Sequence, residues 1–268
     1  MLRPRITPCL LIQNGGLVKT QQFDNPKYVG DPVNAVKIFN EKSVDEIIII
    51  DIDASRLGIA PNYKMIEQLA NESRMPICYG GGIKNCEHAE KIIHMGVEKV
   101  AISSALFERP ELIAELAETI GSQSVVGVLD VKKRFLKGYS VYIYNGSVKV
   151  SKDIDYWITE FQKFGIGEIL INSIDRDGMQ NGYDLSLVKA TSEQINVPAT
   201  FLGGASSLSD IRDLIVARGI GGCAAGSLFV FKGKYRAVLI NYPSFEDKKN
   251  LIINSLNDFY GESSTKIF

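Results

Sequence analysis

The chain has 268 residues, of which 45% are hydrophobic and 23% are charged, and its 30 basic and 31 acidic residues give a net charge of −1. This composition is ordinary for a globular protein, and the near-zero charge argues against a nucleic-acid-binding or polybasic membrane-binding surface. The sequence starts without an apolar signal core, and no run reaches the roughly 18 apolar residues of a membrane helix. We therefore expect a cytoplasmic protein that contacts neither nucleic acid nor membrane.

The cysteines are isolated from one another at positions Cys9, Cys78, Cys86 and Cys223. They form no CxxC pair, and the chain has only two histidines, so a Cys/His zinc site is not expected. Free and mostly buried thiols in a reducing compartment are the simpler interpretation. We predict neither a metal nor a cofactor.

Short apolar runs alternate with helical patterns in the first part of the chain. Strands are predicted at 5–12, 46–51, 76–79 and 99–102, and helices at 31–40, 63–71, 86–95 and 109–120. The run at 46–51 is almost continuously β-branched, which suits a strand buried on both faces. Asp31 and Pro32 are a typical helix cap and first turn. The polar, glycine-containing stretch that ends at Gly30 favours a mobile flap.

The same alternation continues in the second part of the chain. Strands are predicted at 124–130, 168–172, 199–202 and 222–225, helices at 153–164, 185–195 and 208–216, and an inserted hairpin at 137–150. Its turn is the Asn145-Gly146 dipeptide. Eight strands alternating with helices predict a closed (β/α)8 TIM barrel, for which 268 residues is a normal length; an open doubly wound sheet is the alternative.

A glycine turn occurs twice in the chain. The stretch 79–83, Tyr-Gly-Gly-Gly-Ile, has a second version 122 positions later at 201–205, Phe-Leu-Gly-Gly-Ala. Small residues follow each copy, at 103–105 and at 225–227. Glycine turns before helices let backbone N–H groups approach an anion, so the duplication predicts two phosphate-binding turns.

The duplication also divides the chain into parts. We predict a single barrel over 1–268, made of half-barrels at about 1–122 and 123–232, with a C-terminal extension at about 233–268.

Charged residues follow several predicted strands, where barrel enzymes place their chemistry. These candidates are Asp51, Asp53, Asp130, Asp175, Arg176 and Asp177. Asp130 has the best case because its strand ends in Val-Leu-Asp and basic residues follow at 132–134. A carboxylate beside two phosphates can act as a general acid or base. A plain helix cap is the alternative, above all for Asp53 and Asp175.

A second group of charges begins the strands instead of ending them. Its members are Arg5, Glu46, Lys99 and Glu168. In a barrel they would ring the floor, where two acids and two bases can pair. A stabilising salt-bridge cluster is the simplest interpretation of this ring.

Seven stretches of the chain carry a family likeness: 7–10, 80–83, 121–130, 167–170, 175–178, 182–185 and 203–205. Over nearly its whole length, the chain resembles the cyclase subunit of imidazole glycerol phosphate synthase. The resemblance implies a duplicated half-barrel and a substrate with a phosphate at each end. It implies one phosphate site at Gly82, Ser103 and Ser104, and the other at Asp177, Gly178, Gly204, Gly226 and Ser227.

The same resemblance gives the ring of charges a function. In the family, the residues that match Arg5, Glu46, Lys99 and Glu168 gate ammonia. A glutaminase subunit docks on the N-terminal face of the barrel and releases ammonia there. The ammonia then crosses the barrel to the mouth. The resemblance therefore implies a glutaminase partner and a phosphorylated small-molecule substrate.

Two features depart from the family pattern. The cyclase uses a pair of aspartates, of which Asp130 matches the second, whereas Leu11 stands in place of the first. Leucine cannot transfer a proton, and such a loss usually removes on the order of 10²–10⁴ in rate unless another acid such as Asp51 replaces it. The run 232–243 is also different and resembles paralogues found with surface-sugar genes, which are associated with acetamidino modification.

Three functions remain open at this point. The chain could deliver ammonia for amidination of a surface sugar, with a sugar amidotransferase as a further partner. It could be a histidine-biosynthesis cyclase, or a non-catalytic scaffold that activates a glutaminase. Leu11 argues against the cyclase and the phosphate turns argue against the scaffold, so the first function is our prediction.

Overall fold

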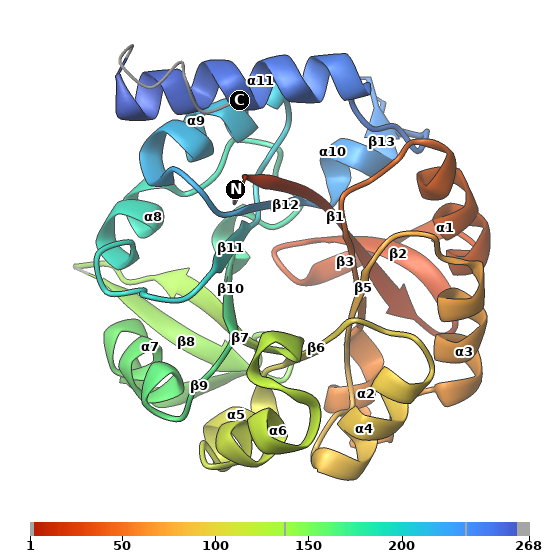
Figure 1. Ribbon diagram of the computed structural model, residues 1–268, viewed down its shortest axis with the longest axis vertical. Coiled ribbons are helices and arrows are strands. Elements are labelled where there is room, and N and C mark those ends of the chain that lie inside the picture. Colours follow the sequence, from red (N-terminus) through yellow and green to blue (C-terminus); the bar gives the residue numbers. More distant parts are fainter. Residues whose placement is uncertain (1–2, 137, 234, 262–268) are drawn as a thin grey trace.

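The computed structural model describes residues 3–136, 138–233 and 235–261, which form a closed barrel (Figure 1). Eight parallel strands make its wall: β1 (Arg5–Gln13), β4 (Ile47–Asp51), β5 (Ile77–Gly80), β6 (Lys99–Ile102), β7 (Val125–Lys133), β10 (Glu168–Ser173), β11 (Ala199–Leu202) and β12 (Gly222–Ala225). Each pairs with the next, and β12 pairs with β1, with Arg5 opposite Gly222. The predicted (β/α)8 barrel is confirmed.

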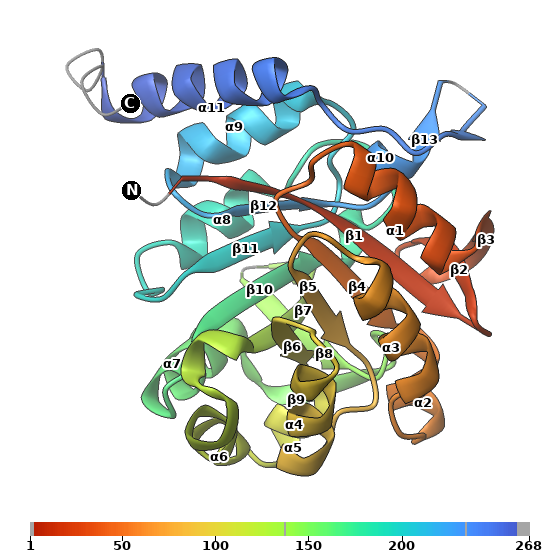
Figure 2. The same ribbon diagram turned by 45° about the vertical axis from the view of Figure 1, so that its right-hand side comes forward.

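Helices surround the strands (Figures 1 and 2). The longer ones are α1 (Pro32–Glu41), α3 (Tyr63–Glu72), α4 (Cys86–His94), α6 (Leu112–Ile120), α7 (Ile154–Lys163), α8 (Leu185–Thr191), α9 (Leu208–Arg218) and α11 (Phe245–Tyr260). Short helices follow three strands: α2 (Ile52–Leu57), α5 (Ser104–Glu108) and α10 (Ser227–Val230). Asp31 caps α1 as predicted, by accepting from the backbone N–H of Asn34. None of the described helices combines the length and apolarity that a membrane span requires.

Two apolar clusters fill the protein. The larger one packs the outer face of the strands against the helices. The smaller one fills the inside of the barrel, and we call its members the lumen residues: Cys9, Ile48, Cys78, Ala101, Val126, Val128, Leu170 and Ala224. Because successive side chains of a strand point to opposite faces of the sheet, a single strand contributes residues to both clusters.

The prediction of a mobile flap before Gly30 was wrong. Strands β2 (Gly16–Gln21) and β3 (Asp24–Gly30) form an antiparallel hairpin that continues from β1, as Figure 2 shows. The turn that connects β1 to β2 is Asn14-Gly15, and both residues have positive φ, at 49° and 77°. This is the two-residue turn that suits the right-handed twist of a hairpin.

The hairpin predicted at 137–150 is confirmed in its described part. It consists of β8 (Tyr139–Ile143) and β9 (Val148–Asp153), while position 137 lies outside the described residues. The fifth barrel strand runs past its predicted end at Asp130, to Lys133, because it pairs there with β8.

The end of the described chain packs against the barrel. After a small hairpin of β13 (Phe231–Lys232) and β14 (Ala237–Val238), α11 packs on α9. Lys248 of α11 donates to Asp45 Oδ1 at 2.7 Å, and the Tyr242 hydroxyl donates to the carbonyl of Ile6 at 2.7 Å. These partly buried bonds join the tail to the start of β1 and to the residues just before β4.

Candidate functional site

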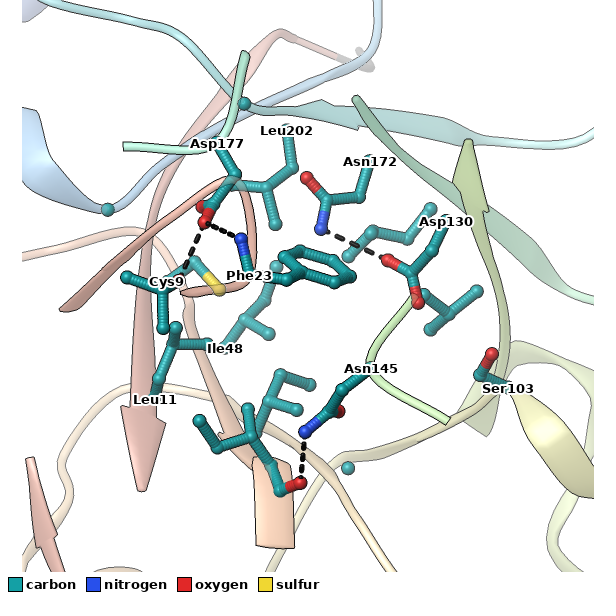
Figure 3. A pocket seen from close by; sticks show the side chains of 18 of the residues that line it. Cys9, Leu11, Phe23, Ile48, Ser103, Asp130, Asn145, Asn172, Asp177 and Leu202 are labelled. Atoms are coloured by element: carbon teal, nitrogen blue, oxygen red, sulfur yellow. Dashed lines mark hydrogen bonds between the residues drawn. The ribbon is translucent and has the colours of Figure 1, made fainter. Parts of the chain in front are cut away.

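One pocket opens where the barrel strands end, and Figure 3 shows it from close by. Most of the predicted site residues line it: Leu11, Ser103, Ser104, Asp130, Asp177, Gly178, Gly204, Gly226 and Ser227. Gly82 lines a smaller pocket beside it, which shares Ser103 and Ser104. Residues far apart in the sequence are thus gathered at one end of the barrel.

The two glycine turns face each other across this pocket. We call Gly82, Ser103 and Ser104 the first cradle, and Asp177, Gly178, Gly204, Gly226 and Ser227 the second cradle. The first follows β5 and β6 and the second follows β10, β11 and β12. Going round the barrel, β1 and β4 lie between the two cradles on one side, and β7 lies between them on the other.

Two glycines of the second cradle have no room for a side chain. At Gly178, with φ of 67°, an added Cβ would lie 1.9 Å from the carbonyl oxygen of Thr20. At Gly204, with φ of 100°, it would lie 2.1 Å from the carbonyl oxygen of Gly182. The second cradle therefore depends on glycine for both conformation and space.

We expect Gly178→Ala to lower the free energy of unfolding by about 2–3 kcal/mol, because it combines a backbone clash with a left-handed φ. The matched control is Gly165→Ala, where φ is 84° but no atom lies within 4 Å of the added Cβ. The control should cost only about 1 kcal/mol, since it has the conformational strain alone. Urea denaturation of both variants measures the difference, and equal losses would contradict the close contact with Thr20.

Asp130 is a carboxylate in the wall of the pocket. Burial raises its pKa to about 7, and a hydrogen bond from Asn172 opposes this rise. Asn172 Nδ2 donates to Asp130 Oδ1 at 3.0 Å (Figure 3). A carboxyl group that titrates near neutral pH can both accept and return a proton, which general acid–base catalysis requires.

The hydrogen bond from Asn172 predicts how Asp130 titrates. We expect Asn172→Leu to raise the pKa of Asp130 above 7, because the donor that favours the charged form is lost. The carbon resonance of the Asp130 carboxyl group, followed against pH by NMR, measures this pKa. Ser103→Ala is the control, because Ser103 lines the same pocket without a hydrogen bond to Asp130. A pKa that fell in Asn172→Leu would contradict the expectation.

The wall beside Asp130 also holds polar atoms without partners. Asn172 Oδ1, Ser103 Oγ and Ser173 Oγ are buried and have no hydrogen-bond partner among the described residues. Asn172 and Ser103 line the pocket itself. Buried polar atoms are usually hydrogen-bonded, so these atoms suit contacts with a bound polar molecule.

Leu11 brings an apolar side chain to the same pocket. It pairs with Ile50 of β4 and packs with Ile50 and Leu202 against the lumen residues. Asp51, a carboxylate that lines the same pocket, caps α2: its Oδ1 accepts from the backbone N–H groups of Asp53 and Ala54. Asp51 is therefore engaged as a helix cap and is a poor replacement for a proton-transfer group at position 11.

The other charged candidates at the strand ends hold loops together. Asp53 accepts from the backbone N–H of Asn14 at 3.0 Å and pairs with Arg56. Asp175 accepts from the backbone N–H of Lys133 at 2.7 Å. Asp53, Asp175 and Arg176 do not line the pocket, so their structural interpretation is favoured.

Lys19 lies on β2 and lines the pocket, although the sequence did not predict it as a site residue. It is buried, its Nζ donates to the carbonyl of Cys9 at 2.5 Å, and burial lowers its pKa. A Cβ added at Gly226 would lie 2.2 Å from this Nζ, so the ammonium group rests against the second cradle. The same hairpin holds Asp177, which accepts from the Thr20 hydroxyl at 2.6 Å. The Asn14-Gly15 dipeptide was the signal for the turn that leads into this strand.

The predicted ring of charges is one ion-pair cluster at the opposite end of the barrel. Lys99 Nζ lies 2.8 Å from Glu46 Oε1 and 2.9 Å from Glu168 Oε2. Arg5 pairs with both carboxylates, and the Thr200 hydroxyl donates to Glu168 at 2.6 Å. We call Arg5, Glu46, Lys99 and Glu168 the floor cluster. The lumen residues lie between it and the pocket.

Comparison with known proteins identifies similar chains. The profile of the family described as Histidine biosynthesis protein matches residues 5–236. A Leptospira interrogans protein provisionally named imidazole glycerol phosphate synthase subunit HisF is 54% identical over 94% of this chain and 99% of its own. A Vibrio vulnificus protein provisionally named subunit hisF3 is 53% identical over 94% of this chain and 97% of its own. The Clostridium botulinum (strain Okra) imidazole glycerol phosphate synthase subunit HisF is 37% identical over 87% and 92%.

Proposed function

Because the chain belongs to the histidine biosynthesis protein family, and within it to the HisF-like subunits of imidazole glycerol phosphate synthase, we propose that it is the synthase subunit of a glutamine amidotransferase. It receives ammonia from a glutaminase at the floor of the barrel and delivers it to a phosphorylated acceptor in the pocket. The observation that carries this proposal is the order along the barrel axis: floor cluster, apolar lumen, then Asp130 between two cradles.

The first step after glutamine hydrolysis is the passage of ammonia past the floor cluster. Opening it needs movement of Lys99, whose Nζ joins Glu46 to Glu168. Beyond this point the lumen residues are apolar, and six of the eight are Ile, Val, Leu or Ala. An ammonium ion would lose its hydration there, at a high cost in free energy, whereas neutral ammonia passes more easily. The lumen therefore favours the nucleophilic form.

The second step is attack on the acceptor at the mouth. The two cradles hold its anionic groups, so that its reacting carbon lies above the lumen. Asp130 takes a proton from the attacking nitrogen, which its pKa of about 7 permits. Asn172 keeps the carboxyl group in place through the 3.0 Å hydrogen bond. The carbon–nitrogen bond forms as a bond from the reacting carbon to an oxygen breaks, and the proton that the nitrogen loses goes to Asp130.

For the acceptor we favour a surface sugar that is amidinated, with a sugar amidotransferase as a further partner. Leu11 stands in place of the first of the two acids that imidazole ring closure uses, and Asp51 is engaged as a helix cap. The chain is also more similar to the provisionally named HisF proteins, at 54% and 53% identity, than to the Clostridium botulinum subunit at 37%. A histidine-biosynthesis cyclase is the second candidate, supported by Asp130 and both cradles. A scaffold that only activates the glutaminase leaves the cradles unexplained.

The test is to combine the purified chain with its cognate glutaminase. We expect glutamine hydrolysis to rise when a phosphorylated ligand binds, while the histidine-pathway intermediate is not cyclised even with added ammonium salt. Cyclisation at the rate of ordinary cyclases would contradict the sugar assignment. Hydrolysis that no phosphorylated ligand stimulates would support the scaffold.

Leu11→Asp separates a missing acid from a different substrate. A gain of cyclisation in this variant would mean that the pocket accepts the histidine-pathway intermediate and lacks only the acid. Leu202→Asp is the matched control, because it places the same carboxylate on β11 of the same pocket. Cyclisation gained equally in both variants would mean that position 11 has no special role.

A further inference from the structure

Arg236 lies beside the second cradle, in the turn between β13 and β14. Its Nη2 donates to Ser227 Oγ at 3.4 Å, and its guanidinium carbon lies 4.7 Å from the centre of the Phe231 ring. Its carbonyl oxygen accepts from Lys27 of β3 at 3.0 Å. Its φ is 50°, a backbone region that side-chain-bearing residues seldom occupy. Contacts from three elements therefore hold Arg236 in an uncommon conformation.

The bond from Arg236 determines what the Ser227 hydroxyl can do. A hydroxyl group has one hydrogen to donate and can accept other hydrogen bonds. Because Ser227 Oγ accepts from Arg236, its hydrogen remains available for an acceptor in the pocket that Ser227 lines. Arg236 Nε is buried and has no hydrogen-bond partner among the described residues. Among the described residues the guanidinium group has no ion pair within 4 Å, although its charge acts on the carboxylate of Asp177, and its side-chain hydrogen bond goes to Ser227.

The two cradles differ in charge as a result. Near the second cradle, Lys19 and Arg236 stand against one carboxylate, Asp177. Near the first cradle, one acid and one base line the smaller pocket, Glu108 and Lys84, and the Lys84 ammonium group donates to the carbonyl of Gly58. Cations within hydrogen-bonding range favour the more highly charged anion, since charge-assisted hydrogen bonds are roughly twice as strong as neutral ones.

We infer that Arg236 makes the second cradle the site for the more highly charged end of the ligand, a phosphomonoester dianion, so that the ligand binds in one orientation. Arg236 is a positioning residue that acts through Ser227. The less charged end of the ligand lies at the first cradle. This inference depends on the proposed function, because anion binding at both cradles is part of it.

The experiment uses inorganic phosphate, at a pH where it is a dianion, and reads each cradle separately. In protein labelled with ¹⁵N-glycine, the amide signals of Gly82 and Gly226 report the first and the second cradle. We expect Arg236→Ala to weaken phosphate binding at Gly226 about tenfold, as for loss of a hydrogen bond involving a charged group, and to leave binding at Gly82 unchanged. Arg236→Lys should restore part of the affinity, because it keeps the charge.

The matched control is Lys232→Ala, which removes an exposed cation from the same small hairpin. It should leave binding at both glycines unchanged. A fall at Gly226 in Arg236→Ala, without one in the control, supports the inference. Phosphate binding at both glycines that Arg236→Ala does not alter would overturn it and leave the proposed function intact. The absence of phosphate binding at either glycine in the unaltered protein would overturn both.

Discussion

Replacing Glu168 by glutamine is expected to lower the free energy of unfolding by about 3 kcal/mol, as for a buried ion pair that loses one partner. Glu168 is 6% exposed and accepts from Arg5, Lys99 and Thr200. Its removal leaves Arg5 and Lys99 to share Glu46 alone. The loss is at the low end of the range for buried pairs because water reaches the Arg5 side chain, which is 30% exposed. Urea denaturation at neutral pH measures it.

The matched control is Glu115→Gln, because Glu115 pairs with Arg109 at 3.0 Å and both side chains are about half exposed. Water screens such a pair, so the control should lose less than about 1 kcal/mol. Equal losses in the two variants would mean that the floor cluster adds no more stability than a surface pair.

The pH dependence of the same variants gives a second measure of the floor cluster. Attraction to Arg5 and Lys99 holds the pKa of Glu168 below its ordinary value, despite burial. A carboxylate with a lowered pKa stabilises the fold above its ordinary pKa, and this stability is lost as the pH falls through the lowered value. The stability difference between the unaltered protein and Glu168→Gln should therefore shrink on acidification below about pH 4.

The closed barrel could be predicted from sequence because its strands are buried on both faces. The run 46–51 is almost continuously β-branched, which suits such a strand and no amphipathic helix, and β4 is found there. The duplicated glycine turn added a second signal, because two turns related by one shift occupy equivalent places in a repeated fold. Fold class and strand order followed from these two local features.

The antiparallel turn from β1 into β2 could have been predicted but was not. Asn14-Gly15 is a strong hairpin signal, and Leu17 and Val18 after it are both buried. The polar residues around them favoured a loop instead. Since β2 runs antiparallel to β1, recognising it as a strand would have placed Lys19 and Thr20 beside the pocket.

Other parts of the site depend on contacts that no local pattern contains. Lys19 meets Gly226, and Arg236 meets Ser227 through a small hairpin with little sequence signal of its own. The near-neutral pKa of Asp130 depends on its burial and on Asn172, from a different strand. The roles of the cradles and of the floor cluster stay predictions, because they came from the duplicated glycine turn and from the family resemblance and need measurement.

Asp130→Asn is expected to lower the rate of acceptor amination by a factor on the order of 10²–10⁴, as for loss of a general base. Because the variant keeps the size of the side chain and its place beside Asn172, the phosphorylated ligand should still bind. Stimulation of the glutaminase should persist, since the floor cluster lies at the other end of the barrel. The measurement pairs the amination rate with the glutamine hydrolysis rate in the same complex.

The same substitution should also stabilise the protein at alkaline pH. The pKa of Asp130 is raised to about 7, so the folded state keeps a proton that the unfolded state releases between about pH 4 and 7. The free energy of unfolding of the unaltered protein therefore falls as pH rises through this range and levels off above it. Asparagine removes this fall, so above pH 7 the variant should be more stable by roughly 1–3 kcal/mol.

Asp175→Asn is the control for both measurements. Asp175 follows β10, the strand that pairs with β7, and lies outside the pocket. Its side chain accepts from the backbone N–H of Lys133. The Asp175→Asn variant should keep the amination rate of the unaltered protein and show no gain in stability at alkaline pH. Loss of amination without a stability gain in Asp130→Asn would mean that the pKa of Asp130 is not raised. Its carboxylate would then be ionised already at low pH and would be a weak base near neutral pH. A stability gain without loss of amination would mean that Asp130 has a raised pKa but is not the base that takes a proton from the attacking nitrogen.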